Sequence, residues 1–370
     1  MSDQISENVV KTTDVGRKFP KESSEVAKGI AILLMLFYHL FSDAQDNHIM
    51  EVNFSPLPED LFLMIAKFGN ICVSAFVFLT AYGISAKLYN SKELTLKDAY
   101  ASSFKRAGKL FFNFFVVFAI VNLLWFKFFD YALLYGAGKQ GVLAFIADAL
   151  SLSHFFGTPT LNMTWWYMSI AYTLVFLVPL FACLCKKTGY PFLAAAFLIP
   201  FMFPMQNDIS RYFFVMAFGI TAAYGNWFEK ILNSKIPVAL RAVLEIAFLV
   251  FSVFARENEF VQTNLLYLAD AFFAFGIILF AGDIIAAIPG VKQVFAFLGK
   301  HSMNMYFTHT FFYLILFRDF IFRFRYAGVT FLMLLSASLI FSILIELIKK
   351  LLVFLSGKIL RKQSKPAAQS

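Results

Sequence analysis

Two histidines lie inside long apolar runs of this sequence, where an ionisable side chain needs a partner or a function. His39 occurs near the end of the run KGIAILLMLFYHLF, and His309 occurs in GKHSMNMYFTHTFF. Counted along helices that cross a membrane, both lie at a similar depth. A histidine can take a proton from a hydroxyl near neutral pH, so the matching depth favours chemistry at these positions. A hydrogen bond to another helix is the alternative for each histidine taken alone.

Basic residues lie nearer the ends of the apolar runs. Lys28 precedes His39 by 11 residues, which corresponds to three helical turns and ~16 Å of rise, so both side chains share one helix face. Further along, Lys105, Arg106 and Lys109 precede another apolar run, and helical spacing puts Lys105 and Lys109 on one face. This basic cluster predicts either a contact with anionic lipid headgroups or a clamp for the phosphates of a ligand.

Other reactive residue types give weaker signals. Asp270 and Glu346 also fall within apolar runs. They are either ion-coupling residues of a transporter or partners of cations in the bundle. Cys72, Cys183 and Cys185 lack zinc-site spacing, and we expect them to be buried small apolar side chains. The sequence contains no Walker A loop, HExxH, GxSxG or Rossmann GxGxxG motif. We therefore expect no metal site.

The elements that position these residues are predicted to be membrane-spanning helices. Of the 370 residues, 60% are hydrophobic and 15% are charged, whereas soluble domains hold about half and a quarter. A net charge of +9 alone would suggest a nucleic-acid binder, but this apolar excess argues against that class. The runs do not alternate as β-barrel strands do. We predict an all-α, polytopic integral membrane bundle of about ten transmembrane helices, near residues 26–42, 61–86, 110–129, 164–185, 190–205, 210–228, 237–255, 262–286, 297–317 and 328–348.

The distribution of lysine and arginine predicts the orientation. Placing both termini in the cytoplasm puts most basic residues on the inner side and leaves the outer loop 43–60 acidic. The outer loop 318–327 is the exception, because it carries Arg318, Arg323 and Arg325; it either faces an acidic ligand or is an irregular loop. The predicted organisation is a polar cytoplasmic tail at 1–25, one membrane domain at 26–355 and a basic cytoplasmic tail at 356–370.

The first predicted span resembles a signature of the membrane-bound acyltransferase family 3, the O-acetyltransferase-like proteins that modify surface polysaccharides. That signature is an arginine, ten residues and a histidine; Lys28 stands in the place of the arginine, and His39 matches the histidine. Lys105-Arg106-x-x-Lys109 is similar to the family's Arg-Arg-x-x-Arg motif, which is implicated in holding the acyl donor. Both motifs depart from the family by Arg→Lys, and lysine keeps the charge but loses the planar fork of arginine.

Three further segments extend the resemblance to residue 312. SAFVFLTAYGISAKL is similar to the family's Phe-Phe-x-x-Ser-Gly segment, with Thr80 and Ala81 in place of the Ser-Gly pair. TWWYMSIAYTLVFLVPL resembles a Trp-Ser-Leu-x-x-Glu run that ends in proline; Trp166 and Pro179 match, whereas Ala171 stands where many members carry glutamate. LGKHSMNMYFTHTFF resembles a late family motif, which includes Gly299, Ser302, Tyr306 and His309.

The resemblance implies an acyltransferase that moves an acyl group, usually acetyl from acetyl-CoA, to a sugar hydroxyl across the membrane. It implies that the basic cluster holds the donor, that His39 acts as general base or acyl carrier, and that Lys28 neutralises charge or orients the donor. We expect acceptor binding from His309, Trp166 and Tyr306. The alternatives are a link between helices for His309 and a place in the aromatic belt at the outer membrane interface for Trp166. The expected partners are acyl-CoA as donor substrate, a carbohydrate or lipid-linked glycan and membrane lipids, with no nucleic acid and no permanently bound cofactor. The expected location is the plasma membrane.

Two other classes of function stay open on the sequence. A transporter or exporter of acylated or anionic glycan precursors would depend on Asp270, Glu346 and the arginines of loop 318–327. A membrane scaffold or sensor without chemistry would explain the departures at Lys28 and Ala171.

Overall fold

The apolar runs of the sequence form helices wherever the structure describes them. The structure is a computed structural model that describes residue 19 and residues 21–43, 52–91, 96–202 and 208–363. The longer helices are α1 (Lys21–Tyr38), α3 (Glu59–Phe68), α4 (Cys72–Tyr89), α5 (Leu96–Trp125), α7 (Gly138–Ala149), α9 (Tyr167–Thr188), α10 (Pro191–Met202), α11 (Asp208–Gly225), α13 (Val238–Glu257), α15 (Leu266–Asp283), α16 (Val291–Thr310) and α18 (Ala327–Gln363). The shorter ones are α6 (Tyr131–Tyr135), α8 (Ser153–Phe156), α12 (Trp227–Leu232), α14 (Glu259–Asn264) and α17 (Arg318–Ile321). These ranges hold no strand, only an isolated bridge between Asn53 and Tyr326. The all-α prediction is confirmed.

Seven helical segments in the described part of the chain are long and apolar enough to cross a membrane. They are Lys21–Ser42, Glu59–Tyr89, Leu96–Phe128, Met163–Thr188, Val238–Glu257, Leu266–Ala287 and Ala327–Ser356, and each coincides with a predicted span. The predicted spans 190–205, 210–228 and 297–317 fall on α10, α11 and α16, which are helical but shorter or richer in polar residues. The chain is therefore a polytopic helical membrane protein. The count of ten crossings and the cytoplasmic placement of both termini stay predictions.

Several boundaries differ from the predicted ones because polar turns continue apolar helices. α5 begins at Leu96 rather than near 110, so the basic cluster is part of the helix. α1 begins at Lys21, inside the predicted tail 1–25, and α18 continues to Gln363, inside the predicted tail 356–370. The segment 130–162, expected as an outer loop, folds into α6, α7 and α8.

α1 and α16 pack as parallel helices that touch at a pair of glycines. A Cβ added to Gly29 would overlap the backbone carbonyl of Phe295, and one added to Gly299 would overlap the carbonyl of Glu25. Each glycine thus packs against the residue one turn earlier on the partner helix. Small residues of this kind let two membrane helices approach with their backbones in contact. The contact fixes the register of α1 and α16 along their whole length.

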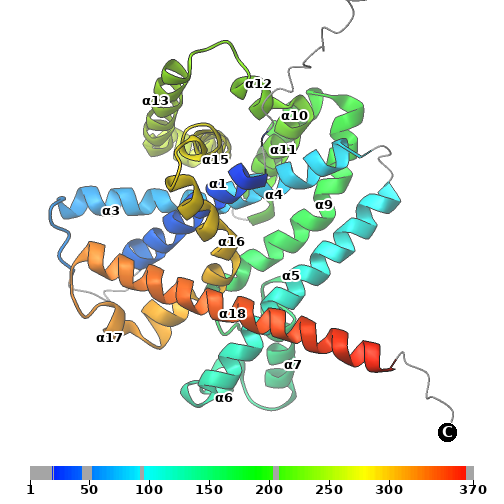
Figure 1. The fold of residues 1–370 in the computed structure, drawn as a ribbon, viewed down its shortest axis with the longest axis vertical. Coiled ribbons are helices and arrows are strands. Elements are labelled where there is room, and N and C mark those ends of the chain that lie inside the picture. Colours follow the sequence, from blue (N-terminus) through cyan, green and yellow to red (C-terminus); the bar gives the residue numbers. More distant parts are fainter. Residues whose placement is uncertain (1–18, 20, 44–51, 92–95, 203–207, 364–370) are drawn as a thin grey trace, which may run out of the picture.

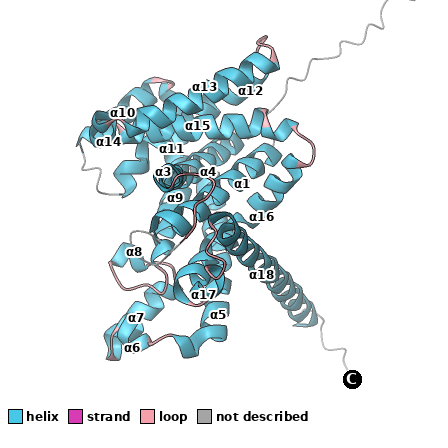
Figure 2. Cartoon of the chain, turned by 90° about the vertical axis from the view of Figure 1, so that its left-hand side faces the viewer, coloured by secondary structure: helices cyan, strands magenta, loops and turns pink. Residues whose placement is uncertain are grey.

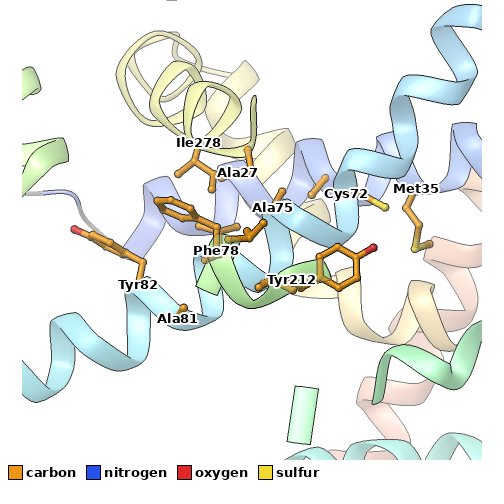
Figure 3. Packing of buried hydrophobic residues seen from close by; sticks show 14 of the residues in the cluster. Ala27, Met35, Cys72, Ala75, Phe78, Ala81, Tyr82, Tyr212 and Ile278 are labelled. Carbon is orange, nitrogen blue, oxygen red and sulfur yellow. The ribbon is translucent and has the colours of Figure 1, made fainter. Parts of the chain in front are cut away.

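The largest core cluster joins α1, α4, α11 and α15. Phe78 of α4 is fully buried there, and Figure 3 shows it with Ala27 of α1, Ala75 of α4 and Ile278 of α15 around it. Gly219 of α11 packs closely on the same turn of α4, since an added Cβ would lie 2.8 Å from the Phe78 carbonyl oxygen. This packing holds α1, α4, α11 and α15 together. α16 lies beside α1 through the glycine contact.

The other helices surround this centre. Figure 1 shows α18 crossing one face of the bundle, and both Figure 1 and Figure 2 show its C-terminal part extending past the other helices. α6, α7 and α8 form a small group beyond the end of α5 (Figure 2). We call this group, residues 130–162, the cap.

Candidate functional site

His39 and His309 lie against each other. Their ring centroids are 5.0 Å apart with the planes tilted by 42°, and His309 is fully buried. The parallel glycine contact explains the meeting, because His39 follows Gly29 by ten residues and His309 follows Gly299 by ten residues. Equal rise along two parallel helices brings the imidazoles to one level. The predicted match in depth is therefore confirmed.

The hydrogen bonds of His309 fix its tautomer. Nδ1 lies 2.8 Å from the carbonyl oxygen of Tyr306, and because a carbonyl only accepts, Nδ1 carries the proton and donates. Nε2 of the neutral ring then holds a lone pair. Nε2 is buried, and no hydrogen-bond partner for it occurs among the residues that the structure describes. Buried polar atoms normally have partners, so this nitrogen is placed to accept a hydrogen bond or a proton from a bound molecule.

Both histidine-bearing helices change geometry at this point. α1 continues as a π-helix over His39–Asp43, and α16 continues as a π-helix over Phe311–Ile315. Short π-helical turns inside α-helices occur frequently at functional sites. Nothing in the sequence analysis indicated them, because they are a property of the packed backbone.

Aromatic residues at the start of α9 cover one side of the histidine pair. The hydroxyl of Tyr306 donates to the carbonyl of Thr164, and the ring of Tyr306 packs edge-on against Tyr167, with centroids 5.8 Å apart. Trp165 is buried, and its Nε1 donates to the carbonyl of Phe307 at 3.1 Å. Trp166 is half-buried and lies one ring further from the histidines. Tyr306 therefore positions the loop, whereas Trp166 keeps an accessible face.

The cap is folded around one carboxylate. Asp148 of α7 is buried and accepts hydrogen bonds from the Tyr135 hydroxyl at 2.6 Å, the Thr160 hydroxyl at 2.8 Å and the Leu161 amide at 2.7 Å. Burial and the neighbouring carboxylate raise the pKa of Tyr135, so its hydroxyl stays protonated and donates. Asp148 was not among the predicted site residues, since an acidic residue in an expected loop does not by itself indicate a structural or functional role.

The cap is also tied to the histidine helix. The side-chain amide of Asn162 donates to the hydroxyl of Thr310 at 2.5 Å, and Thr310 is the neighbour of His309 in sequence. Asn162 also accepts from the Thr164 amide, which begins the turn before α9. The Asp148 cluster thus holds the segment that closes one side of the site.

The basic cluster lies on α5, towards the opposite end of the bundle from the histidines. Lys105 and Lys109 are exposed, and Arg106 is half-buried. One turn after Lys109, Asn113 is buried and accepts from Lys349 Nζ at 3.0 Å. The structure does not bring Lys28 to His39, because Lys28 pairs with Glu25 at 3.4 Å, three turns away along α1.

The carboxylates on which a transporter would depend are paired with cations. Asp270 accepts from Arg256 at 2.8 Å, and Arg211 lies 3.9 Å from its other oxygen. Glu346 pairs with Lys349 and accepts from the Asn304 amide at 2.9 Å. These contacts match the alternative that both are partners of cations in the bundle.

The described residues contain three free cysteines and no candidate metal-ligand cluster. No group of three or more histidine, cysteine, aspartate or glutamate side chains with metal-site geometry occurs there. Cys72 and Cys185 are buried and Cys183 is half-buried, all as free thiols.

Comparison with known proteins gives the family. A family model described as an acyltransferase domain, the acyltransferase 3 model, matches residues 21–348. The chain belongs to the acyltransferase 3 family. No curated protein and no solved structure matches it. The predicted family is therefore confirmed. The histidine pair, the cap and the basic cluster of this membrane acyltransferase all lie within the matched residues.

Proposed function

We propose that this acyltransferase, located in the plasma membrane, transfers an acetyl group from cytoplasmic acetyl-CoA to a hydroxyl of a cell-surface or lipid-linked carbohydrate. The observation that carries the proposal is the histidine pair. His39 and His309 meet inside an apolar bundle, and the buried Nε2 of His309 offers a lone pair without a partner among the described residues. A site of this kind suits proton removal from a hydroxyl.

The donor is proposed to bind at the basic end of α5. Acyl-CoA carries phosphates, and the exposed Lys105 and Lys109 with the half-buried Arg106 provide three cations on neighbouring positions. The buried contact of Lys349 with Asn113 extends a polar track one turn further into the bundle. Lys28 adds a cation on α1, three turns before His39. The acyl end of the donor would then reach inwards to the histidines.

The chemical step assigns one role to each histidine. A ring nitrogen of His39 takes the proton of the acceptor hydroxyl while its oxygen attacks the thioester carbonyl. The carbon–sulfur bond breaks, and the CoA thiolate leaves and takes up that proton. The reacting hydroxyl has one proton, which His39 takes, so Nε2 of His309 accepts a hydrogen bond from a second hydroxyl of the sugar and orients the acceptor. The Tyr306 carbonyl holds the His309 ring in place. Pre-set orientation of this kind lowers the entropic part of the barrier.

The acceptor is proposed to rest on the aromatic residues next to the cap. Trp166 presents a half-buried indole face, which suits stacking against a sugar ring. Tyr306 contributes by holding the Thr164 carbonyl and the start of α9, since its hydroxyl is engaged there.

The test uses the full-length protein in inverted vesicles supplied with labelled acetyl-CoA and a carbohydrate acceptor. We expect label in the glycan with the wild type and a loss of at least about 100-fold with His39→Ala. His301→Ala is the matched control, because His301 lies on α16 two turns before His309 and bonds Ser342 rather than the histidine pair. Full transfer by His39→Ala would remove the assignment.

A further inference from the structure

A buried cluster of charges at the start of α11 is not used by the mechanism above. Asp270 of α15 is almost fully buried between Arg256 of α13 and Arg211 of α11. Arg256 holds Asp270 at 2.8 Å and also donates to the side-chain oxygen of Asn70 at 2.5 Å. Ser74 donates to the second carboxylate oxygen at 3.4 Å. Arg256 and Asp270 therefore form a closed pair with satisfied hydrogen bonds.

Arg211 is bound much more loosely. Its terminal nitrogen is 3.9 Å from Asp270, which is beyond hydrogen-bond distance, and a third of its side chain is exposed. Its Nε is buried, and no hydrogen-bond partner for it occurs in the described part of the chain. Among the described side chains, two guanidinium groups share one carboxylate, so one positive charge is in excess there. That charge belongs to Arg211, because the short contact goes to Arg256.

Arg211 also begins a line of rings that ends at the histidine pair. Its guanidinium lies over the Tyr212 ring, 5.3 Å from the centroid, and Tyr212 stacks on Trp166 at 6.4 Å. From Trp166 the ring contacts continue through Tyr167 to Tyr306 and then to His309, and none of these centroid distances exceeds 6.5 Å.

We propose that Arg211 is an anion subsite that binds the acidic group, a carboxylate or a phosphate, of a sugar whose ring lies on Trp166. An arginine presents a planar fork that matches both groups, and the positive charge of Arg211 attracts an anion. Trp166, which is separated from Arg211 by the Tyr212 ring, supplies the aromatic face that a sugar ring covers. As an acceptor site, this inference rests on the proposed function, and it names the acceptor class as an acidic saccharide.

The arginines of the stretch 318–326 are the competing anion site. Arg323 is exposed in the turn between α17 and α18, whereas Arg318 and Arg325 already have interactions. Arg323→Gln removes the same charge as Arg211→Gln, so it serves as the matched control. Arg211→Gln is expected to fold, because Asp270 keeps its pair with Arg256.

The experiment measures binding of glucuronate, glucose 6-phosphate and glucose to the full-length protein in nanodiscs without acyl donor. We expect at least one acidic sugar to bind about tenfold or more tightly than glucose, since hydrogen bonds to a charged group supply such a factor. Arg211→Gln should abolish the preference, Arg211→Lys should retain part of it, and Arg323→Gln should leave it unchanged. The stronger of the two acidic sugars identifies carboxylate or phosphate as the group bound.

Equal binding of all three sugars by the wild type would overturn the subsite. So would a preference that survives Arg211→Gln or disappears with Arg323→Gln. The binding readout is separate from catalysis: a preference that depends on Arg211 supports the subsite even if no acetyl group is transferred, and that result would refute the proposed function alone.

Discussion

A methyl group at the α1–α16 contact should disable the site from a distance of ten residues. The change is Gly29→Ala, with Gly299→Ala as its counterpart on the other helix. The Cβ added at Gly29 would lie 2.8 Å from the carbonyl carbon of Phe295, whereas carbon atoms in contact are about 3.5–4.0 Å apart. The obstacle is backbone, which cannot rotate away, so α1 and α16 must separate by about 1 Å.

That separation has two consequences of different size. Overpacking of this kind costs about 1–3 kcal/mol of unfolding free energy, because the helices lose contact along their length. A displacement of ~1 Å between reacting groups costs about 100-fold in rate, so the loss of activity should exceed the loss of stability. The double variant should be little worse than either single one, since the first methyl already opens the contact.

The assay is acetyl transfer in vesicles, with thermal unfolding of the same preparations. Gly328→Ala is the control, because Gly328 lies in the first turn of α18 with nothing within 4 Å of an added Cβ. It should leave rate and unfolding temperature nearly unchanged. Wild-type rate and stability in Gly29→Ala would refute the argument that this glycine contact sets the register of the two histidines.

Three further predictions concern the donor, the histidine pair and the cap. His309→Phe should lower the transfer rate by about 100-fold with an unchanged KM for acetyl-CoA, because it removes the acceptor that orients a second hydroxyl of the sugar and touches no phosphate. Steady-state kinetics measure this, and a raised KM would contradict it. Lys109→Gln should raise the KM for acetyl-CoA several-fold, and the effect should be largest at low salt. The control is Lys187→Gln, which removes an exposed lysine from the last turn of α9 and should leave this KM unchanged. Asp148→Asn should lower the free energy of unfolding by about 1–3 kcal/mol, because the amide cannot accept from every donor that the carboxylate serves. Thermal unfolding measures this, and an unchanged midpoint would count against the role of Asp148 in holding the cap.

Sequence reasoning predicted the parts of this structure that depend on composition and helical spacing. Apolar runs of membrane length became helices, and His39 and His309 met because each lies at the same depth of its helix. The spacing of Lys105 and Lys109 likewise survives on α5. These predictions needed only the rise per residue and the cost of a charge in a membrane.

The other contacts between side chains of different helices could not be predicted. Spacing within one helix does not determine which helices touch. Asp148 became the centre of the cap through four donors from three separate segments, and none of those donors is distinctive in sequence. The partners of Asp270 could likewise not be predicted from the sequence, since Arg256 and Arg211 come from other helices. The lone pair on Nε2 of His309 follows from the hydrogen bond that Nδ1 makes, and a sequence does not distinguish the two nitrogens.

The lysine at position 28 illustrates how geometry changes the meaning of a motif. The resemblance places Lys28 and His39 in one signature, yet about 16 Å of helix separates them, so no single small group can contact both. Lys28 is a third exposed and already within reach of Glu25. At this distance a cation would act on the proposed polyanionic donor through its charge rather than through the planar fork of an arginine. We infer that lysine in place of arginine at position 28 preserves the contribution of this position, which is its positive charge. At Lys105 and Lys109, where phosphates are proposed to bind directly, the same replacement changes the hydrogen-bond geometry to the donor.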